Sequence, residues 1–158
     1  MTSQVLTPQA SLTAFSRLLR AHSTLWRELS ARLVTDHGLT INDYEALLHL
    51  SHAENGSLRR VDLAERLMLT PSGVTRLLDG LERDGWVKKG QCDSDARVTY
   101  AVLTDEGRER LESAARTHVA QVCEIFEERF SADELDALGE LLGRLPDVSG
   151  HGESCSPP

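Results

Sequence analysis

The sequence lacks a long apolar run, and its amino terminus lacks a basic stretch followed by an apolar one. The longest uninterrupted apolar runs are a few residues, far short of the roughly 18 that cross a bilayer. Cysteine is scarce as well: three residues at wide spacing form neither a disulfide framework nor a CxxC metal pair. These absences predict a protein without a membrane span or a secretion signal, in the reducing cytoplasm.

Catalytic and nucleotide-binding motifs are also missing, since the chain contains no HExxH, GxSxG, P-loop or GxGxxG. Asp93 and Asp95 form a carboxylate pair, but they fall in a polar turn where no pocket would raise a pKa for acid–base catalysis. His49 and His52 lie three apart on one predicted helix, a spacing that suits a metal, yet no third ligand follows at a matching spacing. We therefore expect no enzyme, no cofactor and no metal centre.

Basic residues are fewer than acidic ones in this sequence. The 158 residues include 17 Lys+Arg and 25 Asp+Glu, for a net charge of −8, which on average disfavours nucleic acid as a partner. The excess is not evenly spread: residues 105–158 hold 13 acidic and five basic side chains, whereas residues 56–104 hold eight basic and seven acidic ones. The middle of the chain is thus mildly basic, and the length suits one domain.

The spacing of apolar residues predicts a mainly helical chain. They recur at three- and four-residue steps from residue 7 to about 33, the pattern of a long amphipathic helix. Similar periods predict helices over about 40–54, 61–67, 70–84, 104–126 and 131–145. Capping signals mark several starts: Thr40 with Asp43, Thr70 before Pro71, and Ser131 with Glu134.

Between residues 85 and 104 the period changes from 3.6 to 2. Residues 86–89 and 97–103 are predicted to be strands joined by the polar turn 90–96, which makes a β-hairpin, and residues 57–60 are predicted to be extended. The expected fold class is mainly α with a small β-hairpin wing (α+β). Residues 147–158 are expected to form a flexible tail.

Two short helices followed by a hairpin rich in Lys and Arg give the order of a winged helix-turn-helix, whose second helix enters the DNA major groove. The start of the 70–84 helix carries small, hydrogen-bonding and basic side chains that suit phosphate and base contacts. They are Thr70, Pro71, Ser72, Gly73, Thr75 and Arg76. An alternative is that Thr70 only caps the helix and Arg76 is only a solvated charge.

In the hairpin, Asp95-Ala96-Arg97 is followed by Leu103-Thr104 and then Gly107, which resembles the DxR…LTxxG wing signature of the MarR family of transcriptional regulators. Upstream, residues 63–87 are similar to the helix-turn-helix of that family at the expected position. The resemblance covers about residues 10–146. It implies one MarR-type domain over residues 1–158, with a winged helix-turn-helix at 57–103 and dimerisation helices at 1–35 and 104–146.

The resemblance also implies roles for single residues. Ser72, Thr75 and Arg76 would face the major groove, while Arg97, held by Asp95, would enter the minor groove, where a narrow groove attracts a guanidinium. Phosphate contacts are expected from basic residues beside them: Lys88 or Lys89, and Arg59 and Arg60. The partners would be a second copy of the chain and a double-stranded DNA operator that is an inverted repeat.

Many members of that family respond to a small aromatic or anionic effector. The candidate pocket residues are His22, Trp26, Tyr44 and His118, each of which also fits an ordinary place in the core or the interface. Thiol sensing is disfavoured, because Cys92 lies beside Asp93, which raises a thiol pKa, and because Cys123 is expected to be buried.

The sequence therefore predicts a homodimeric repressor that binds a palindromic operator and is released by a small-molecule effector. The alternative is a winged-helix protein-interaction module that does not bind DNA, an alternative motivated by the net charge of −8.

Overall fold

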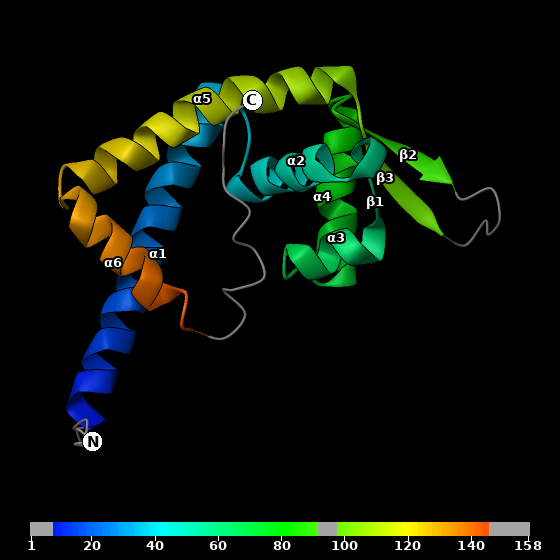
Figure 1. The fold of residues 1–158 in the computed structure, drawn as a ribbon. Helices are drawn as coiled ribbons and strands as arrows, with labels where there is room; N and C mark the ends of the chain where they lie inside the picture. The colour runs from blue at the N-terminus through cyan, green and yellow to red at the C-terminus, as the bar shows by residue number, and fades with distance from the viewer. Residues whose placement is uncertain (1–7, 92–97, 146–158) are drawn as a thin grey trace. The chain divides into compact units, whose positions relative to one another are not determined.

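The computed structural model describes residues 8–91 and 98–145, which are mostly helical with a three-stranded antiparallel sheet (Figure 1). The mainly α fold class with a small wing is confirmed. The elements, in chain order, are α1 (Pro8–His37), α2 (Ile41–His52), the 3₁₀ turn η1 (Glu54–Gly56), β1 (Ser57–Arg59), α3 (Arg60–Arg66), α4 (Pro71–Arg83), β2 (Val87–Gln91), β3 (Thr99–Leu103), α5 (Asp105–Glu127) and α6 (Ala132–Leu142).

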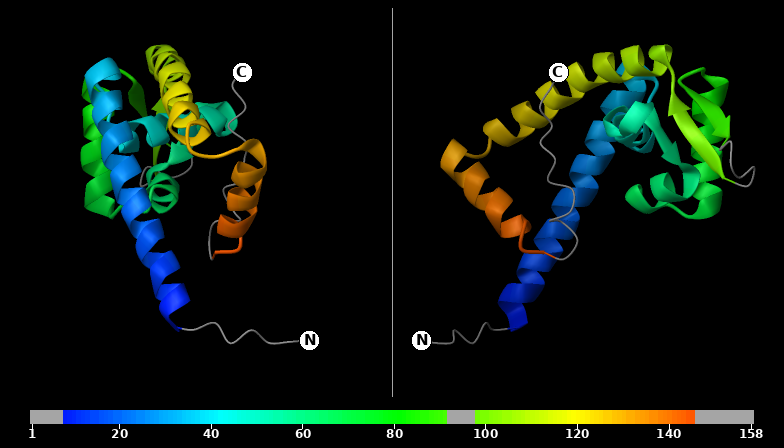
Figure 2. Two further views of the ribbon diagram at one scale, coloured as in Figure 1. Left: turned by 90° about the vertical axis from the view of Figure 1, so that its left-hand side faces the viewer. Right: turned by 45° about the vertical axis from the view of Figure 1, so that its right-hand side comes forward.

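The chain divides into two compact units, Met1–Leu111 and Glu112–Pro158, and α5 crosses from the first into the second. In the first unit, α2, α3, α4 and the sheet pack together, and the amino-terminal half of α1 extends away from them (Figure 2). The second unit contains the remainder of α5 and α6.

The sheet has the strand order β1-β3-β2. The hairpin of β2 and β3 pairs Val87 with Leu103 and Gln91 with Thr99, as expected for a wing. The sequence prediction missed that the extended piece β1 pairs with the other edge of β3, with Ser57 opposite Val102. Because β3 is hydrogen-bonded along both edges, the base of the wing is fixed to the start of α3.

The core of the first unit lies between the end of α1 and α2, α3 and α4. Its largest fully buried side chains are all leucines: Leu33, Leu39, Leu47, Leu50, Leu63, Leu78 and Leu81. Burial of one leucine stabilises the fold by about 1.5–3 kcal/mol relative to exposure. These leucines anchor the buried face of α4, so that its opposite face is directed to solvent.

The predicted capping residues begin the helices where expected. Thr40 and Ser131 form full capping boxes with Asp43 and Glu134, and Thr70 caps α4. Two helix ends differ from the prediction. The first helix continues to His37, because Gly38, at a φ of +67°, is the residue that ends it. The last ends at Leu142, because Gly143 follows as its C-cap.

Glu45 on α2 is half-buried, and this burial raises the pKa of its carboxyl because desolvation disfavours the charged form. A folded-state pKa above the unfolded value makes wild-type stability fall as the pH rises through these pKa values. We expect Glu45→Gln to raise the free energy of unfolding at pH 7 by up to about 1 kcal/mol, and to change nothing below about pH 3, where Glu is protonated in both states.

Urea unfolding of both proteins across this pH range measures the difference. Glu54→Gln, at an exposed carboxylate, is the control and should match the wild type throughout. A Glu45→Gln protein that gains no stability at pH 7 would contradict a desolvated carboxylate at this position.

Candidate nucleic-acid interface

The start of α4 is held by its own side chains. The Thr70 hydroxyl accepts a hydrogen bond from the Gly73 amide at 3.1 Å, and its oxygen lies 3.2 Å from that of Ser72. Pro71 occupies the first turn, where its missing N–H costs nothing. The open end of this 13-residue helix therefore carries the positive end of the helix dipole together with two hydroxyl groups.

The two faces of α4 are sharply divided. Val74, Leu78 and Leu81 are buried. Ser72, Thr75 and Arg76, which the sequence predicted to meet the major groove, are exposed. The Thr75 hydroxyl donates to the Pro71 carbonyl at 2.8 Å, so its oxygen is left to accept a hydrogen bond from an outside donor such as a base amino group.

The two wing lysines differ in their contacts. Both are exposed on β2, but Lys89 pairs with Glu82 of α4, with 3.1 Å between Nζ and Oε2. This ion pair links β2 of the wing to α4. Lys88 forms no such ion pair within the described residues. Asp95 and Arg97, the predicted minor-groove pair, and Cys92 lie outside the described residues.

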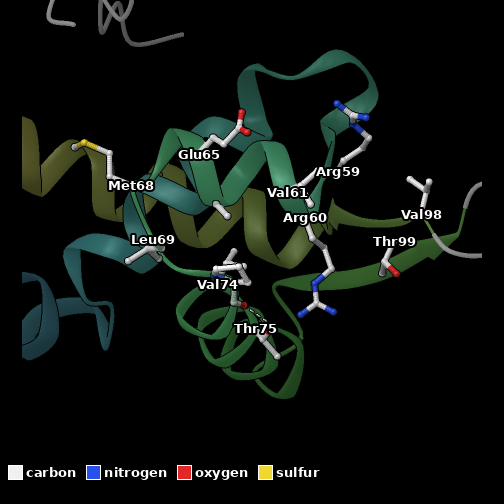
Figure 3. Close-up of a pocket in the computed structure, with 12 residues that line it drawn as sticks. Arg59, Arg60, Val61, Glu65, Met68, Leu69, Val74, Thr75, Val98 and Thr99 are labelled. Carbon is white, nitrogen blue, oxygen red and sulfur yellow. Dashed lines mark hydrogen bonds between the residues drawn. The ribbon is translucent and has the colours of Figure 1, made fainter. Parts of the chain in front are cut away.

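The two arginines before α3 also differ. Arg59 makes a bidentate contact with Asp62, at 2.7 Å for both bonds, and this hydrogen bond holds the pKa of the Asp62 carboxyl below its usual value. The charge of Arg59 is therefore partly neutralised on the surface. Arg60 instead points toward α4 and β3, beside a cavity of about 660 Å³ (Figure 3).

This cavity between α3, α4 and β3 was not predicted. Its walls combine apolar side chains, such as Val61 and Val74, with the hydroxyl-bearing Thr75 and Thr99. The Nη2 atom of Arg60 is buried and has no hydrogen-bond partner within residues 8–91 and 98–145. No sequence signal separates Arg60 from Arg59, because the difference arises from the close approach of three elements.

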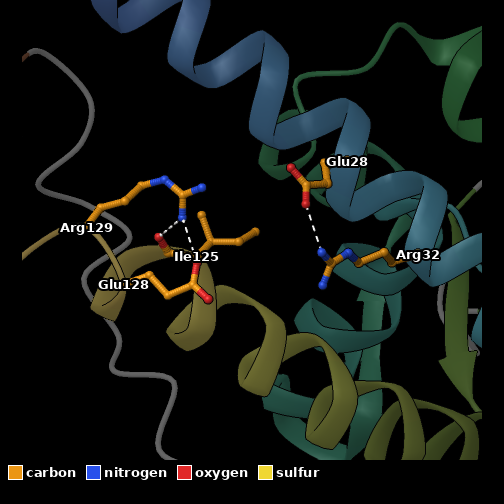
Figure 4. Close-up of polar contacts among 5 residues, drawn as sticks. All are labelled: Glu28, Arg32, Ile125, Glu128 and Arg129. Carbon is orange, nitrogen blue, oxygen red and sulfur yellow. Dashed lines mark hydrogen bonds and ion pairs between the residues drawn. The ribbon is translucent and has the colours of Figure 1, made fainter.

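Two arginines outside the winged segment are paired on their own helices (Figure 4). In the first unit, Arg32 pairs with Glu28 one turn earlier on α1, at 2.9 Å. In the second unit, Arg129 donates to the Ile125 carbonyl at 2.6 Å, at the end of α5, and lies 3.4 Å from Glu128.

The predicted effector residues occupy different settings. His22 and Trp26 stack along the exposed face of α1, with ring centroids 5.6 Å apart, whereas Tyr44 is buried in the core of the first unit. His118 belongs to the second unit, and burial lowers the pKa of its imidazole. The pocket itself stays a prediction.

Cys123 is exposed, so the expectation of a buried thiol was wrong. The residue lies two positions before the buried Ile125 on α5, which places it on nearly the opposite face of the helix. The described residues contain no cluster of three or more metal-ligating side chains around His49 and His52 or elsewhere. None of the described helices is long and apolar enough to cross a membrane.

Removal of the Arg60 guanidinium should not destabilise the fold, because its buried Nη2 has no partner among the described residues and an unsatisfied donor is costly. We expect Arg60→Met to leave the free energy of unfolding unchanged or to raise it by up to about 1 kcal/mol, as measured by urea unfolding. Arg59→Met, which leaves Asp62 unpaired, is the comparison. A loss above about 1 kcal/mol for Arg60→Met would show that the guanidinium is satisfied in solution.

Comparison with known proteins gives a consistent result. The model of the MarR family matches residues 37–98. The HTH-type transcriptional repressor YetL of Bacillus subtilis is 34% identical over 108 residues, which are 68% of this chain and 64% of YetL, so the chain spans slightly less than two thirds of that relative. The HTH-type transcriptional regulator YkoM of the same organism is 31% identical over 85% of this chain and 87% of YkoM.

Solved structures agree with these relatives. The MarR family regulator Sco3205 of Streptomyces coelicolor, crystallised in complex with DNA, is 30% identical with a TM-score of 0.78, over 89% of this chain and 88% of that one. Sco5413 of the same organism is 32% identical with a TM-score of 0.77, over 92% and 99%. The chain described here belongs to the MarR family of transcriptional regulators.

Proposed function

We propose that the protein is a homodimeric repressor that binds an inverted-repeat operator in double-stranded DNA and is released from it by a small-molecule effector. The observation that carries the proposal is the division of α4 into a buried apolar face and an exposed face with Ser72, Thr75 and Arg76. The YetL repressor and the DNA complex of Sco3205 support the same reading.

In this proposal the start of α4 binds both phosphate and bases. Thr70, Pro71, Ser72 and Gly73 bring a helix end and hydroxyl groups to the phosphate backbone. Thr75 accepts a hydrogen bond from a base amino group, and Arg76 donates two to a guanine edge. A bidentate contact of this kind contributes about 1–3 kcal/mol of discrimination between bases.

The wing supplies the second set of contacts. Lys88 neutralises a phosphate. Lys89 also binds a phosphate, which replaces the Glu82 carboxylate as its ionic partner. Arg97 enters the minor groove and Asp95 directs its guanidinium, as the family resemblance implies. Arg60 lines the cavity between α3, α4 and β3, and its guanidinium adds positive charge for the phosphate backbone on this side of α4.

Dimerisation would cover the apolar side chains that α1 leaves in solvent. Leu12 is 66% exposed and Phe15 is 59% exposed, and Leu19 lies on the same helix at 49%. Exposed apolar side chains on one helix are typical of an interface. Residues 1–35 and 104–146 supply this interface in the proposal, and a small aromatic or anionic effector binds near His22, Trp26, Tyr44 and His118.

Selection from a pool of random-sequence duplexes tests the DNA-binding function. The wild-type protein should enrich an inverted repeat whose half-sites lie about one helical turn apart. The double variant Ser72→Ala/Arg76→Ala should bind the enriched duplex about five- to 150-fold more weakly, which corresponds to about 1–3 kcal/mol, with a smaller change on random DNA.

Arg66→Ala is the matched control, because it removes one exposed charge that the proposal places neither against DNA nor in the dimer interface. No enrichment at low salt would favour the protein-interaction alternative. An equal loss on selected and random DNA would contradict base recognition by these two residues.

The oligomeric state tests the role of α1. We expect light scattering to give the mass of two 17.5 kDa chains for the wild type and of one chain for Phe15→Glu, because a carboxylate cannot be buried without a partner. Met68→Glu, at an apolar residue that is 93% exposed in the turn before α4, should stay dimeric. A wild type with the mass of a single chain would overturn the dimer.

A further inference from the structure

The LTxxG signature lies where β3 becomes α5, and it contacts the end of α4 and the start of β2. The Thr104 hydroxyl donates to the Gly85 carbonyl at 2.7 Å and accepts from the Gly107 amide at 3.0 Å. The Thr104 amide donates to the Trp86 carbonyl at 3.1 Å. One residue therefore binds both peptide groups through which the chain leaves α4.

Gly107 packs against the same segment. A Cβ at this position would overlap the Trp86 carbonyl oxygen, and it would lie 2.9 Å from Cδ1 of Leu103. Glycine is required here by the approach of two backbones, since the turn of α5 touches the peptide that follows Trp86. The contact leaves no space for a side chain or for movement of this peptide toward α5.

The indole of Trp86 is held from a third direction. The guanidinium carbon of Arg110, on the second turn of α5, lies 5.0 Å from the centroid of the Trp86 ring, within cation–π range. The exit of α4 is also fixed internally, because Gly85 adopts a φ of +78° and the Trp86 amide donates to Leu81 at 2.9 Å, the bond of a Schellman motif.

We propose that Thr104, Gly107 and Arg110 are positioning residues for DNA recognition, which set the angle between α4 and the wing by holding Gly85 and Trp86. None of the three lies on α4 or β2, and they act through the segment that joins these two elements. This inference rests on the proposed function, because it concerns the affinity for the selected duplex.

The contacts of Thr104, Gly107 and Arg110 with Gly85 and Trp86 affect DNA recognition as well as the stability of the fold. A protein that reads the major groove with α4 and the minor groove with its wing must present both at a fixed separation. Gly85 and Trp86 are the only residues between Arg83 with its C-cap Asp84 and the start of β2 at Val87. A small rotation at these two residues displaces the wing relative to α4, and binding sites tolerate displacements of only about 0.5 Å.

The test compares Thr104→Val with Ser51→Ala. Each variant removes one hydroxyl, but the Ser51 hydroxyl donates only along α2, to the Leu48 carbonyl at 2.7 Å, and Ser51 lies outside the proposed dimer interface. We expect Thr104→Val to bind the selected duplex about five- to thirtyfold more weakly, because the two hydrogen bonds of its hydroxyl are lost in each protomer. Affinity for random DNA should change less than about twofold, and Ser51→Ala should match the wild type on both.

Arg110→Met is the second variant, and it keeps the fold testable if Thr104→Val unfolds. Its control is Arg66→Met, which removes the same charge at an exposed position at the end of α3, outside the proposed dimer interface. Hydrogen exchange of residues 85–91 supplies a readout without DNA. Exchange there should be faster in Thr104→Val and in Arg110→Met than in their controls. The melting temperature of Arg110→Met should stay within a few degrees of the wild type.

The outcomes separate the two proposals. A wild type that enriches no duplex overturns the proposed function, and with it the DNA role of these residues. A wild type that binds the selected duplex, together with Thr104→Val and Arg110→Met proteins that are folded and bind it equally well, overturns the positioning role alone. An equal loss on selected and random DNA also overturns it, because positioning acts on the ratio between them.

Discussion

The contact between the Gly107 backbone and the Trp86 carbonyl is the constraint on which the rest of the winged segment depends. The first turn of α5 and the peptide that joins α4 to β2 meet there without an intervening side chain, and each fixes the other. The start of α5 follows directly from β3, so its position is set by the sheet. The end of α4 is held by the leucine core. The peptide between Gly85 and Val87 joins these two constraints, and its conformation is determined from both sides.

Charge acts on a different scale from this packing. The net charge of −8 suggests poor binding to nucleic acid, yet the acidic excess lies after Thr104. Within the winged segment, Arg59 and Lys89 are paired with carboxylates. In the proposed function, general attraction to DNA is therefore weak, and recognition depends more on shape and on a few directed contacts.

Sequence reasoning predicted the elements whose causes are local. Thr40, Thr70 and Ser131 cap helices because their side chains bond the backbone three residues ahead, and periodicity alone divides α4 into a buried and an exposed face. Ser72, Thr75 and Arg76, which the family resemblance directs to the major groove, lie on the exposed side of α4. Their contacts to bases stay predictions.

The missed features depend on residues that are distant in the chain. The extended conformation of β1 was predicted, but its pairing with β3 was missed, because a three-residue strand carries no sequence signal of its partner. The buried nitrogen of Arg60 results from the meeting of α3, α4 and β3. Cys123 was misplaced because apolar neighbours suggested a buried face, whereas the helical angle to Ile125 puts it on the other side.

The place of β3 in the middle of the sheet has a consequence for how such a protein can change over evolution. A one-residue insertion within β3 would disturb two ladders at once and turn its side chains to the opposite face, exposing Ala101 and Leu103. An insertion between Gln91 and Thr99 leaves both ladders in register. The length of the wing can therefore vary during evolution, while the paired strands at its base and the adjoining helix α4 stay the same.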